Sequence, residues 1–390
     1  MPGKADPIVI VGGGIAGAAA AAALAAKGND VLMLEQAPEF KEIGAGVQFG
    51  PNAVKMLRRL GLSDAFNHLA ILPEAAVMLD SVTGETVVEI PYGEAFSKRF
   101  GAPYTLVHRA DLHQALLDLV KSSGRVEQHI NTRIVDIEER DDGVTVVADD
   151  GRTFGGSALI GADGLWSVIR NRVVGDGSPR VSGHVTYRAV LPVAEMPEHL
   201  RSSKMTLWAG DKVHSVCYPL RGGEFYNLAA TFHSDRYEQG WDAFGDADEL
   251  HARFVGKHPS LLQILGKIET WRMWVLCDRD PVKNWSTERI TLIGDAAHPT
   301  LQYLGQGAAM SLEDAVCIAA ELDASGGNFA VAARAYQEKR YLRTARVQIQ
   351  SRLYGEVYHA DGVAREVRNQ LLSSTGMSLE SMAWMYDYEL

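Results

Sequence analysis

The first 35 residues alternate between short apolar runs and a long stretch of small residues. Residues 7–11 (PIVIV) form an apolar run of the length that is typical of a buried parallel strand. An alanine-rich helix is predicted to follow and to end near Lys27, and residues 30–35 form a second strand that ends on Glu35. The pattern therefore predicts a strand–helix–strand unit.

Gly12, Gly14 and Gly17 lie in G-x-G-x-x-G register between the first strand and the helix. The first glycine allows a tight turn, the second lets the backbone approach a pyrophosphate, and the third lets the helix pack close to the strand. The N–H groups at the start of the helix attract phosphates, and Glu35 can accept hydrogen bonds from a ribose hydroxyl. The unit predicts a dinucleotide site, but it does not distinguish FAD from NAD.

Two later segments also place an aspartate directly after an apolar strand. Residues 158–164 (ALIGADG) contain Asp163, and residues 290–295 (ITLIGD) end on Asp295. Each segment taken alone is a common turn. Between them, residues 178–280 are richer in β-branched and aromatic side chains with alternation, which is typical of strands in a mixed sheet. The chain is therefore expected to combine helices with two kinds of sheet.

The composition argues against several classes of partner. The 390-residue chain has a formal net charge of -11 and a pI near 5.6, which disfavour nucleic acid and an anionic membrane surface. Its three cysteines (Cys217, Cys277 and Cys317) are far apart, so neither a disulfide framework nor a metal site is predicted, and a reducing cytoplasm is expected. Residues 8–26 are uncharged, but they are mostly alanine and glycine and predict neither a signal peptide nor a membrane span.

Taken in this order, the three motifs resemble those of the class A flavoprotein aromatic hydroxylases, the p-hydroxybenzoate hydroxylase-like group, over almost the whole chain. Residues 44–53 and the run His108-Arg109-Ala110-Asp111-Leu112 are similar to two further segments that surround the flavin in this group. The resemblance implies bound FAD, with NADH as the co-substrate. NADH is expected to bind transiently, because the sequence has no second G-x-G-x-x-G and hence no separate nicotinamide domain.

The motifs and the resemblance together assign one set of residues to FAD. The set is Gly12, Gly14, Ile15, Ala16, Gly17, Glu35, Gln36, Gly46, Val47, Arg109, Ile134, Asp163, Asp295, Pro299, Gly307, Ala308 and Ala309. The resemblance implies that Asp295 binds the ribitol or ribose and that Asp163 supports the pyrophosphate region and the use of NAD(P)H. The helix that starts near Gly307 is expected to point its N-terminus at the flavin N1–C2=O edge, where reduced flavin carries negative charge.

Two residues near these motifs have more ordinary interpretations. For Arg109, the alternative to contact with FAD is a surface ion pair with Asp111. His298 follows Asp295 closely, but it is interpreted as structural support for the flavin loop.

We expect an α/β fold in which a Rossmann-like FAD-binding domain with a parallel sheet is interleaved with a mixed β-sheet substrate domain, with C-terminal helices. The boundaries are residues 1–72, 106–177 and 281–325 for the FAD-binding domain, 73–105 and 178–280 for the substrate domain, and 326–390 for the helical region. Helices are predicted over residues 308–324 and 328–375. The aromatic tail is expected to dock on the body or on a partner subunit, in a homodimer that the resemblance implies.

Three segments narrow the resemblance to the 3-hydroxybenzoate 6-hydroxylases. They are residues 101–104 (GAPY), 214–224 (HSVCYPLRGGE) and 298–304 (HPTLQYL). The resemblance implies catalytic roles for His214, Tyr218 and Gln302, and substrate-binding roles for Tyr104 and Gln302. One departure is Gly305-Gln306-Gly307, where those relatives have an Ala-Ser-Gly type sequence. Beside the flavin, this difference could alter the fit of the substrate.

The implied reaction needs an electron-rich ring. Reduced flavin and O2 give a C4a-hydroperoxide, an electrophile that attacks a phenolate more readily than a phenol. His214 is expected to accept the phenol proton or to hydrogen-bond the anion. Tyr218 lies four residues further on, so on a strand it shares a face with His214. Attack para to the hydroxyl of 3-hydroxybenzoate would give 2,5-dihydroxybenzoate (gentisate).

Three alternatives stay open. A hydroxylase of the same group that acts on salicylate or 6-hydroxynicotinate would share every FAD motif. An FAD-binding redox sensor or binding module that no longer hydroxylates would not need His214, Tyr218 and Gln302, so their joint presence counts against it. An FAD-dependent reductase of an isoprenoid chain would need a long apolar tunnel. The choice of NADH over NADPH rests on resemblance alone.

Overall fold

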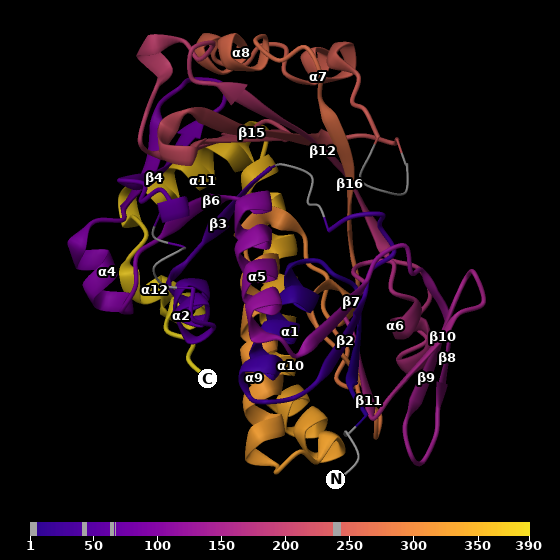
Figure 1. Cartoon of the computed structure of the whole chain (residues 1–390). Coiled ribbons are helices and arrows are strands. Elements are labelled where there is room, and N and C mark those ends of the chain that lie inside the picture. The colour runs from indigo at the N-terminus through magenta and orange to yellow at the C-terminus, as the bar shows by residue number, and fades with distance from the viewer. Residues whose placement is uncertain (1–5, 41–44, 63–65, 67, 237–242) are drawn as a thin grey trace.

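Two large sheets and a column of helices form most of the described molecule. The structure is a computed structural model, and it describes every residue except 1–5, 41–44, 63–65, 67 and 237–242. Figure 1 shows the mixed sheet at the top, the parallel sheet below it, and long helices beside the parallel sheet. The combination agrees with the predicted α/β fold.

The parallel sheet has the strand order β17-β11-β1-β2-β7. Its strands are β1 (Ile8–Val11), β2 (Val31–Leu34), β7 (Val126–His129), β11 (Ala158–Gly161) and β17 (Ile290–Leu292). Every neighbouring pair runs parallel, which confirms the predicted strand–helix–strand unit. The three motif-bearing strands β1, β11 and β17 are adjacent, so their carboxyl ends lie side by side.

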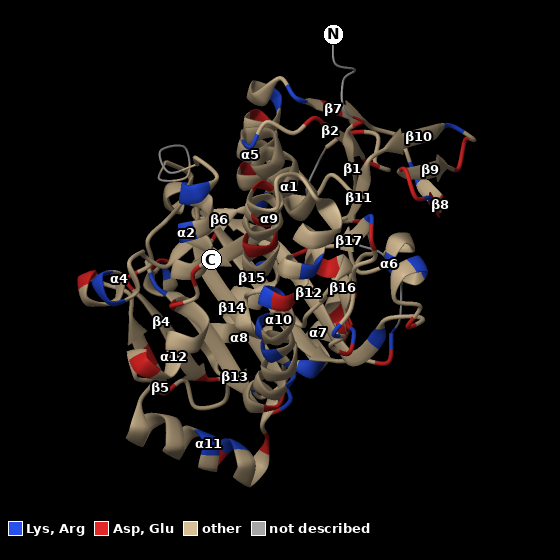
Figure 2. Ribbon diagram, turned by 90° about the horizontal axis from the view of Figure 1, so that it is seen from below, with Lys and Arg blue, Asp and Glu red and all other residues tan. Residues whose placement is uncertain are grey.

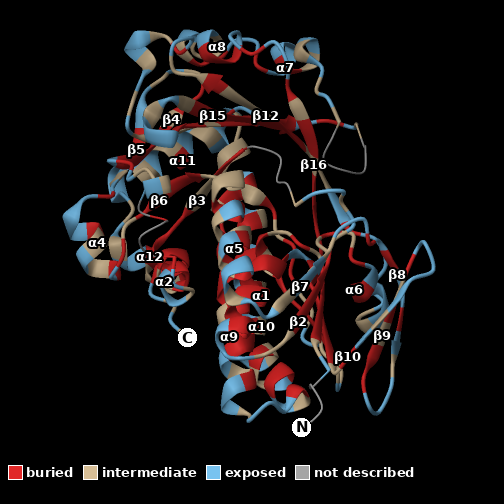
Figure 3. Ribbon diagram, viewed as in Figure 1, coloured by how far each residue is buried: buried red, intermediate tan, exposed pale blue. Residues whose placement is uncertain are grey.

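Helix α1 (Ile15–Ala26) is buried because its small side chains allow close packing. Most of its alanines are buried, and Figure 3 shows the helix in the core. It packs against the sheet and against α5 (Arg109–Ser123) and α9 (Gly307–Ala324). A Cβ on Gly17 would lie 1.9 Å from the carbonyl oxygen of Gly12, so glycine is needed for this approach.

The mixed sheet has the strand order β16-β12-β15-β14-β13-β4-β5. Its strands are β4 (Ala75–Asp80), β5 (Thr86–Pro91), β12 (Arg180–Pro192), β13 (Met205–Gly210), β14 (Val213–Leu220), β15 (Phe225–His233) and β16 (Arg272–Asp278). Only β13 and β4 pair in parallel. Helices α7 (Ala247–Arg253) and α8 (Pro259–Leu265) cover the outer face, as Figure 1 shows, so the other face is turned toward the parallel-sheet lobe.

Smaller elements lie between the two lobes and beside the parallel sheet. The pair β3 (Gly46–Phe49) and β6 (Thr105–His108) is antiparallel and lies between the sheets, with α2 (Pro51–Arg59) and α4 (Glu94–Phe100) beside it. A three-stranded antiparallel sheet and α6 (Val168–Val173) flank the parallel sheet. The strands of this small sheet are β8 (Ile134–Glu139), β9 (Val144–Ala148) and β10 (Thr153–Gly156).

The prediction of a single helix over residues 328–375 is wrong, because the structure has two helices there, α10 (Phe329–His359) and α11 (Gly362–Thr375). The break occurs where α10 meets the turn between β13 and β14. The N–H groups of Asp211 and Lys212 in that turn donate to the carbonyls of Ala360 and His359, at 2.7 and 3.1 Å. The sheet thus satisfies the carbonyls at the helix end and places His359 against β14.

The C-terminal tail docks on the body of the same chain. Helix α12 (Leu379–Tyr386) packs against α4 and α2, and Met382 and Tyr386 are buried. The uncharged segment 8–26 forms β1 and α1. Across the described residues, no helix is long and apolar enough to span a membrane.

A cluster of four buried charges joins α9 to α10. Arg340 donates to Glu313 at 2.5 Å and to Asp314 at 2.7 Å, and Arg343 donates to Glu313 at 3.0 Å. All four side chains are at most 6% exposed. Burial raises the pKa of both carboxyls, but the neighbouring cations outweigh it and hold the pKa values of Glu313 and Asp314 below their usual range. Figure 2 shows charges of both signs where these helices lie side by side.

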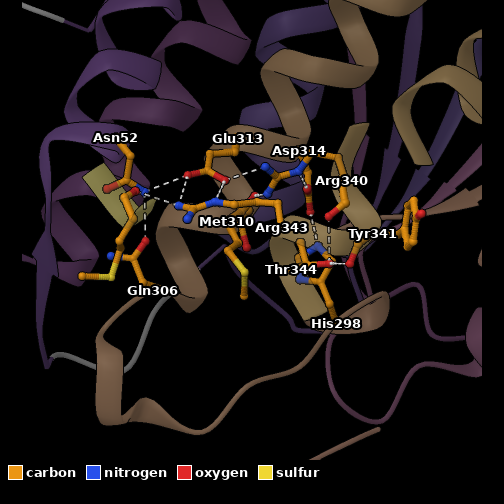
Figure 4. Close-up of polar contacts among 12 residues, drawn as sticks. Asn52, His298, Gln306, Met310, Glu313, Asp314, Arg340, Tyr341, Arg343 and Thr344 are labelled. Atoms are coloured by element: carbon orange, nitrogen blue, oxygen red, sulfur yellow. Dashed lines mark hydrogen bonds and ion pairs between the residues drawn. The ribbon is translucent and has the colours of Figure 1, made fainter. Parts of the chain in front are cut away.

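The charge cluster also fixes the loop before α9. Asp314 accepts from the N–H of Gly294 at 2.8 Å and lies 2.6 Å from Nε2 of His298, while Asn52 donates to Glu313 at 2.7 Å. Figure 4 shows the contacts of Asn52 and His298 with the cluster. His298 therefore supports the loop from within, in agreement with its interpretation as a structural residue.

Replacing Arg340 with Met should strongly destabilise the fold. The variant leaves Glu313 and Asp314 with one cation between them, and breaking a buried pair typically costs about 3–5 kcal/mol. Thermal unfolding should show a large fall in Tm. The matched control is Lys339→Met on the same helix. The Lys339 side chain is 55% exposed and pairs with Glu321, so this variant should change stability by less than about 1 kcal/mol. Equal effects of the two variants would contradict the role given to the cluster.

Candidate active site

One cavity of about 730 Å³ lies between the parallel-sheet lobe and the inner face of the mixed sheet. Most of the residues predicted for cofactor and substrate line it. They are Gly14, Ile15, Ala16, Gly46, Val47, Tyr104, Arg109, His214, Tyr218, Asp295, Pro299, Gln302, Gly307 and Ala308. Segments as far apart in sequence as α1 and α9 thus contribute to a single site.

The cofactor end of the cavity receives the starts of two helices. Gly14 precedes the first turn of α1, and Gly307 begins the first turn of α9; within the described chain no side chain caps either helix. Their first-turn N–H groups are therefore available to an anionic group. Asp295 is exposed toward the same space. Two uncapped helix starts and one carboxylate fit a dinucleotide that has both phosphates and hydroxyls.

Two predicted acids have protein partners in the structure. Glu35 accepts from the N–H of Gly13 at 2.6 Å and from that of Ala37 at 2.8 Å, so its carboxylate lies at the glycine turn. Asp163 accepts from Ser167 Oγ at 2.6 Å and from the N–H of Val168 at 2.8 Å. It therefore holds the start of α6, and burial raises its pKa despite these hydrogen bonds.

The remaining predicted positions lie away from the cavity wall. Gly12 and Gly17 form the tight contact between the first strand and α1. Gln36 is exposed, and Ile134 and Ala309 are buried in the core of the parallel-sheet lobe. Gly44, part of the segment matched above, lies outside the described residues.

The β3–β6 pair brings Gly46, Arg109 and Tyr218 together. The N–H of Arg109 donates to the carbonyl of Ala45 at 2.9 Å. A Cβ on Gly46 would lie 2.5 Å from the ring of Tyr218, so the strand approaches the mixed sheet at a glycine. Asp111 was the ion-pair partner considered for Arg109. In the structure, the carboxylate of Asp111 accepts two hydrogen bonds from Arg221, at 2.7 and 2.9 Å.

His214 and Tyr218 share the cavity face of β14, as their spacing predicts. Burial, with a smaller contribution from His184, lowers the pKa of His214 to about 3, so the imidazole is neutral near pH 7. Nδ1 of His214 lies 2.7 Å from Nε2 of His359. The other ring nitrogen is therefore the one left for a molecule in the cavity.

Gln48 links the two predicted tyrosines. The hydroxyl of Tyr104 donates to Oε1 of Gln48 at 2.8 Å, and Gln48 also hydrogen-bonds the hydroxyl of Tyr218. Burial raises the pKa of both phenols, so both stay protonated. These three residues form a polar patch beside Gly46.

Arg188 is a functional candidate that the sequence analysis missed. It lines the cavity on β12, lies over the Trp274 ring at 4.2 Å, and donates to Oε1 of Gln302 at 2.6 Å. Burial lowers its pKa to about 10, so it keeps its charge at neutral pH. Among the described residues, no carboxylate forms an ion pair with it. A buried guanidinium of this kind suits a carboxylate of the ligand.

Gln302 is held against the sheet by the same contacts. Its Nε2 donates to Thr186 at 2.6 Å and to Thr231 at 3.0 Å, while Oε1 faces Arg188. Gln302 therefore orients Arg188 at the cavity wall.

The Gly305-Gln306-Gly307 departure lies beside the cavity, but the side chain of Gln306 is turned away from it. Gln306 is buried and accepts from Nδ2 of Asn52 at 2.9 Å, whereas the two glycines line the cavity. The side chain of Gln306 therefore does not line the cavity, where it would have to lie to alter the fit of the substrate directly.

The cavity continues beyond the polar residues into an apolar part. Side chains from β4, β5, β13 and the C-terminal helices line it, including Met78, Leu207, Val357, Met377 and Met382. The isoprenoid-reductase alternative predicts a long apolar tunnel, of which this region has the apolar character.

Residues 6–349 match a protein family described as FAD binding domain. The chain is 45% identical to the 3-hydroxybenzoate 6-hydroxylase of Klebsiella oxytoca over 98% of this chain and 96% of that protein. Its fold is similar to Klebsiella pneumoniae HpxO complexed with FAD and uric acid, at a TM-score of 0.84, 25% identity and 97% of each chain. It is also similar to a salicylate hydroxylase substrate complex, at a TM-score of 0.82, 26% identity, and 99% and 96% of the two chains.

Replacing Arg188 with Met should weaken the binding of an aromatic carboxylate about tenfold or more. A charge-assisted hydrogen bond is worth about 1.5–3 kcal/mol, and about 1.4 kcal/mol is a factor of ten in Kd. Titration of the oxidised protein with benzoate and 3-hydroxybenzoate gives the Kd. The matched control is Arg272→Met. Arg272 lies on β16 directly opposite Arg188, and its guanidinium lies over the ring of Phe244. Unchanged affinity in the Arg188 variant would rule out a role in binding the carboxylate.

Proposed function

The chain belongs to the FAD-binding family of flavoprotein aromatic hydroxylases, and we propose that its substrate is 3-hydroxybenzoate. One atom of O2 is added para to the hydroxyl, which gives 2,5-dihydroxybenzoate (gentisate), and NADH supplies the electrons. The observation that carries this proposal is the pairing of a cationic Arg188 with a neutral His214 in one cavity. The two groups match the carboxylate and the phenol of a hydroxybenzoate, and the names of the relatives narrow the choice to the 3-hydroxy isomer.

The cofactor part of the proposal assigns FAD to the end of the cavity where α1 and α9 begin. Ala16, Arg109 and Asp295 would hold the pyrophosphate and sugar-alcohol parts, and the start of α9 would face the flavin ring. When bound and reduced, FAD supplies activated oxygen. The protein's own contribution is to position the substrate ring and to exclude water from the space between the lobes.

At the substrate end, His214 accepts a hydrogen bond or the proton of the phenol, because its neutral ring offers a lone pair to the cavity. The resulting phenolate is richer in electrons at the para carbon. Arg188 holds the carboxylate and is itself oriented by Gln302. Tyr218 and Tyr104, joined through Gln48, supply the polar wall beside the ring.

Two related activities remain alternatives, hydroxylation of salicylate or of 6-hydroxynicotinate, because they would use the same cofactor site. A non-hydroxylating FAD protein is disfavoured by the family, and so is the isoprenoid reductase despite the apolar part of the cavity. The homodimer also stays a prediction. Exposed apolar side chains on α10 and α11, among them Leu342, Ile349, Val363 and Leu371, offer a surface for it.

A panel of aromatic acids tests the substrate directly. With 3-hydroxybenzoate, we expect NADH oxidation and O2 uptake that match gentisate formation, measured by absorbance, an oxygen electrode and chromatography. Salicylate and 6-hydroxynicotinate should stimulate NADH oxidation weakly and give little product. NADPH in place of NADH should be poorer. Tight coupling with salicylate, and catechol as the product, would refute the proposal.

A further inference from the structure

Three imidazoles and one phenol form a continuous contact chain that begins at the cavity. Nδ1 of His214 lies 2.7 Å from Nε2 of His359, and Nδ1 of His359 lies 3.3 Å from Nε2 of His184. Nδ1 of His184 in turn lies 2.7 Å from the hydroxyl of Tyr303. The residues come from β14, the last turn of α10, β12 and the loop before α9. Four separate segments therefore converge to build this histidine chain.

The histidine chain has two self-consistent arrangements of hydrogens. A neutral imidazole carries one N–H donor and one lone pair, so a bond that points one way between two rings sets the direction of the next. In one arrangement every ring donates from Nδ1, and Nε2 of His214 is a free acceptor at the cavity. In the other, Tyr303 donates to His184, every ring donates from Nε2, and His214 presents an N–H to the cavity.

Burial prevents the inner rings from holding a positive charge. It lowers the pKa of His214 to about 3 and lowers the pKa of His359 further, with additional repulsion from the neighbouring imidazoles. A phenol proton left on His214 would create a cation in this dry environment. A shift of protons along the chain avoids that charge, because each ring gains one N–H as it loses the other.

The far end of the histidine chain is closer to solvent. His184 is only partly buried, and its cross-strand neighbour His233 is exposed, with 6.0 Å between the two ring centroids. Tyr303, also at this end, is itself buried and lines the cavity; burial and, to a smaller extent, the exposed Glu356 raise the pKa of its phenol. A proton that reaches His184 therefore has a shorter route to water than one that stays on His214.

We propose that His359 and His184 are positioning residues that, with Tyr303, relay the substrate's phenol proton between His214 and the partly exposed end of the histidine chain at His184. This inference rests on the proposed function, since it needs a phenol in the cavity. The phenol O–H breaks as Nε2 of His214 gains the proton, and Nδ1 of His214 passes its own proton to His359. His359 passes one to Nε2 of His184, and Nδ1 of His184 passes its own proton to the oxygen of Tyr303 as the Tyr303 O–H gives its proton to water. Reversal of the same steps returns a proton to the product phenolate and restores the first arrangement.

The test uses ionisation of a bound phenol and needs no turnover. Oxidised holoenzyme is mixed, without NADH, with 3-hydroxy-4-nitrobenzoate at a pH where the free probe is mostly the phenol, and stopped-flow absorbance follows the coloured phenolate. His359→Gln keeps a donor and an acceptor but does not pass protons between two ring nitrogens. We expect it to slow phenolate formation about a hundredfold, the lower end of general acid–base contributions, and to change the solvent isotope effect on that step.

A second variant separates relay from packing. His359→Ala should be equally slow, and added imidazole should restore part of the rate. FAD content and Tm confirm that each variant is folded. Wild-type rate and isotope effect in His359→Gln would overturn the relay and leave the histidines as packing between α10 and the sheet. If the wild-type protein ionises the probe through His359 but does not hydroxylate 3-hydroxybenzoate, the relay stands and the proposed substrate fails.

Discussion

The geometry of the site depends on the neutralised charge cluster between α9 and α10. Two carboxylates and two guanidiniums are buried together, so removal of any one leaves an uncompensated charge in the core. The same carboxylates hold the N–H of Gly294 and the ring of His298. Because Asp295 and the start of α9 lie on either side of these contacts, the cluster sets where a flavin meets both a carboxylate and a helix N-terminus.

The walls of the cavity are joined across the lobes by single close contacts. Asn227 on β15 accepts from the N–H of Gly46 at 2.7 Å, and the ring of Tyr218 fills the space that a side chain at Gly46 would need. On the other side, Gln302 from the loop before α9 meets Arg188 and the threonines of the mixed sheet. These contacts between the lobes therefore fix the groups that hold the cofactor relative to those that face the substrate.

Motifs near the glycine turn were predictable because their chemistry is local. Gly12, Gly14 and Gly17 act through backbone shape, and short apolar strands of that kind predict a parallel sheet, although not its five-strand order. Arg188 and His359 were not predictable, since each acquires its role only from partners on distant segments. The break between α10 and α11 was missed for the same reason, because the turn of Asp211 and Lys212 ends the helix from outside it. For Asp163 the motif was recognised but the contact was not, because its carboxylate accepts from the N–H of Val168 at the start of α6.

The central claim is that reduced cofactor, dioxygen and a 3-hydroxybenzoate held by Arg188 and His214 meet in this cavity. The most direct measurement is turnover of 3-hydroxybenzoate with NADH under ¹⁸O2, with mass spectrometry of the aromatic product. The account predicts gentisate that carries a single ¹⁸O atom in the new hydroxyl. Unlabelled gentisate, or NADH oxidation that yields only hydrogen peroxide with every hydroxybenzoate offered, would contradict it.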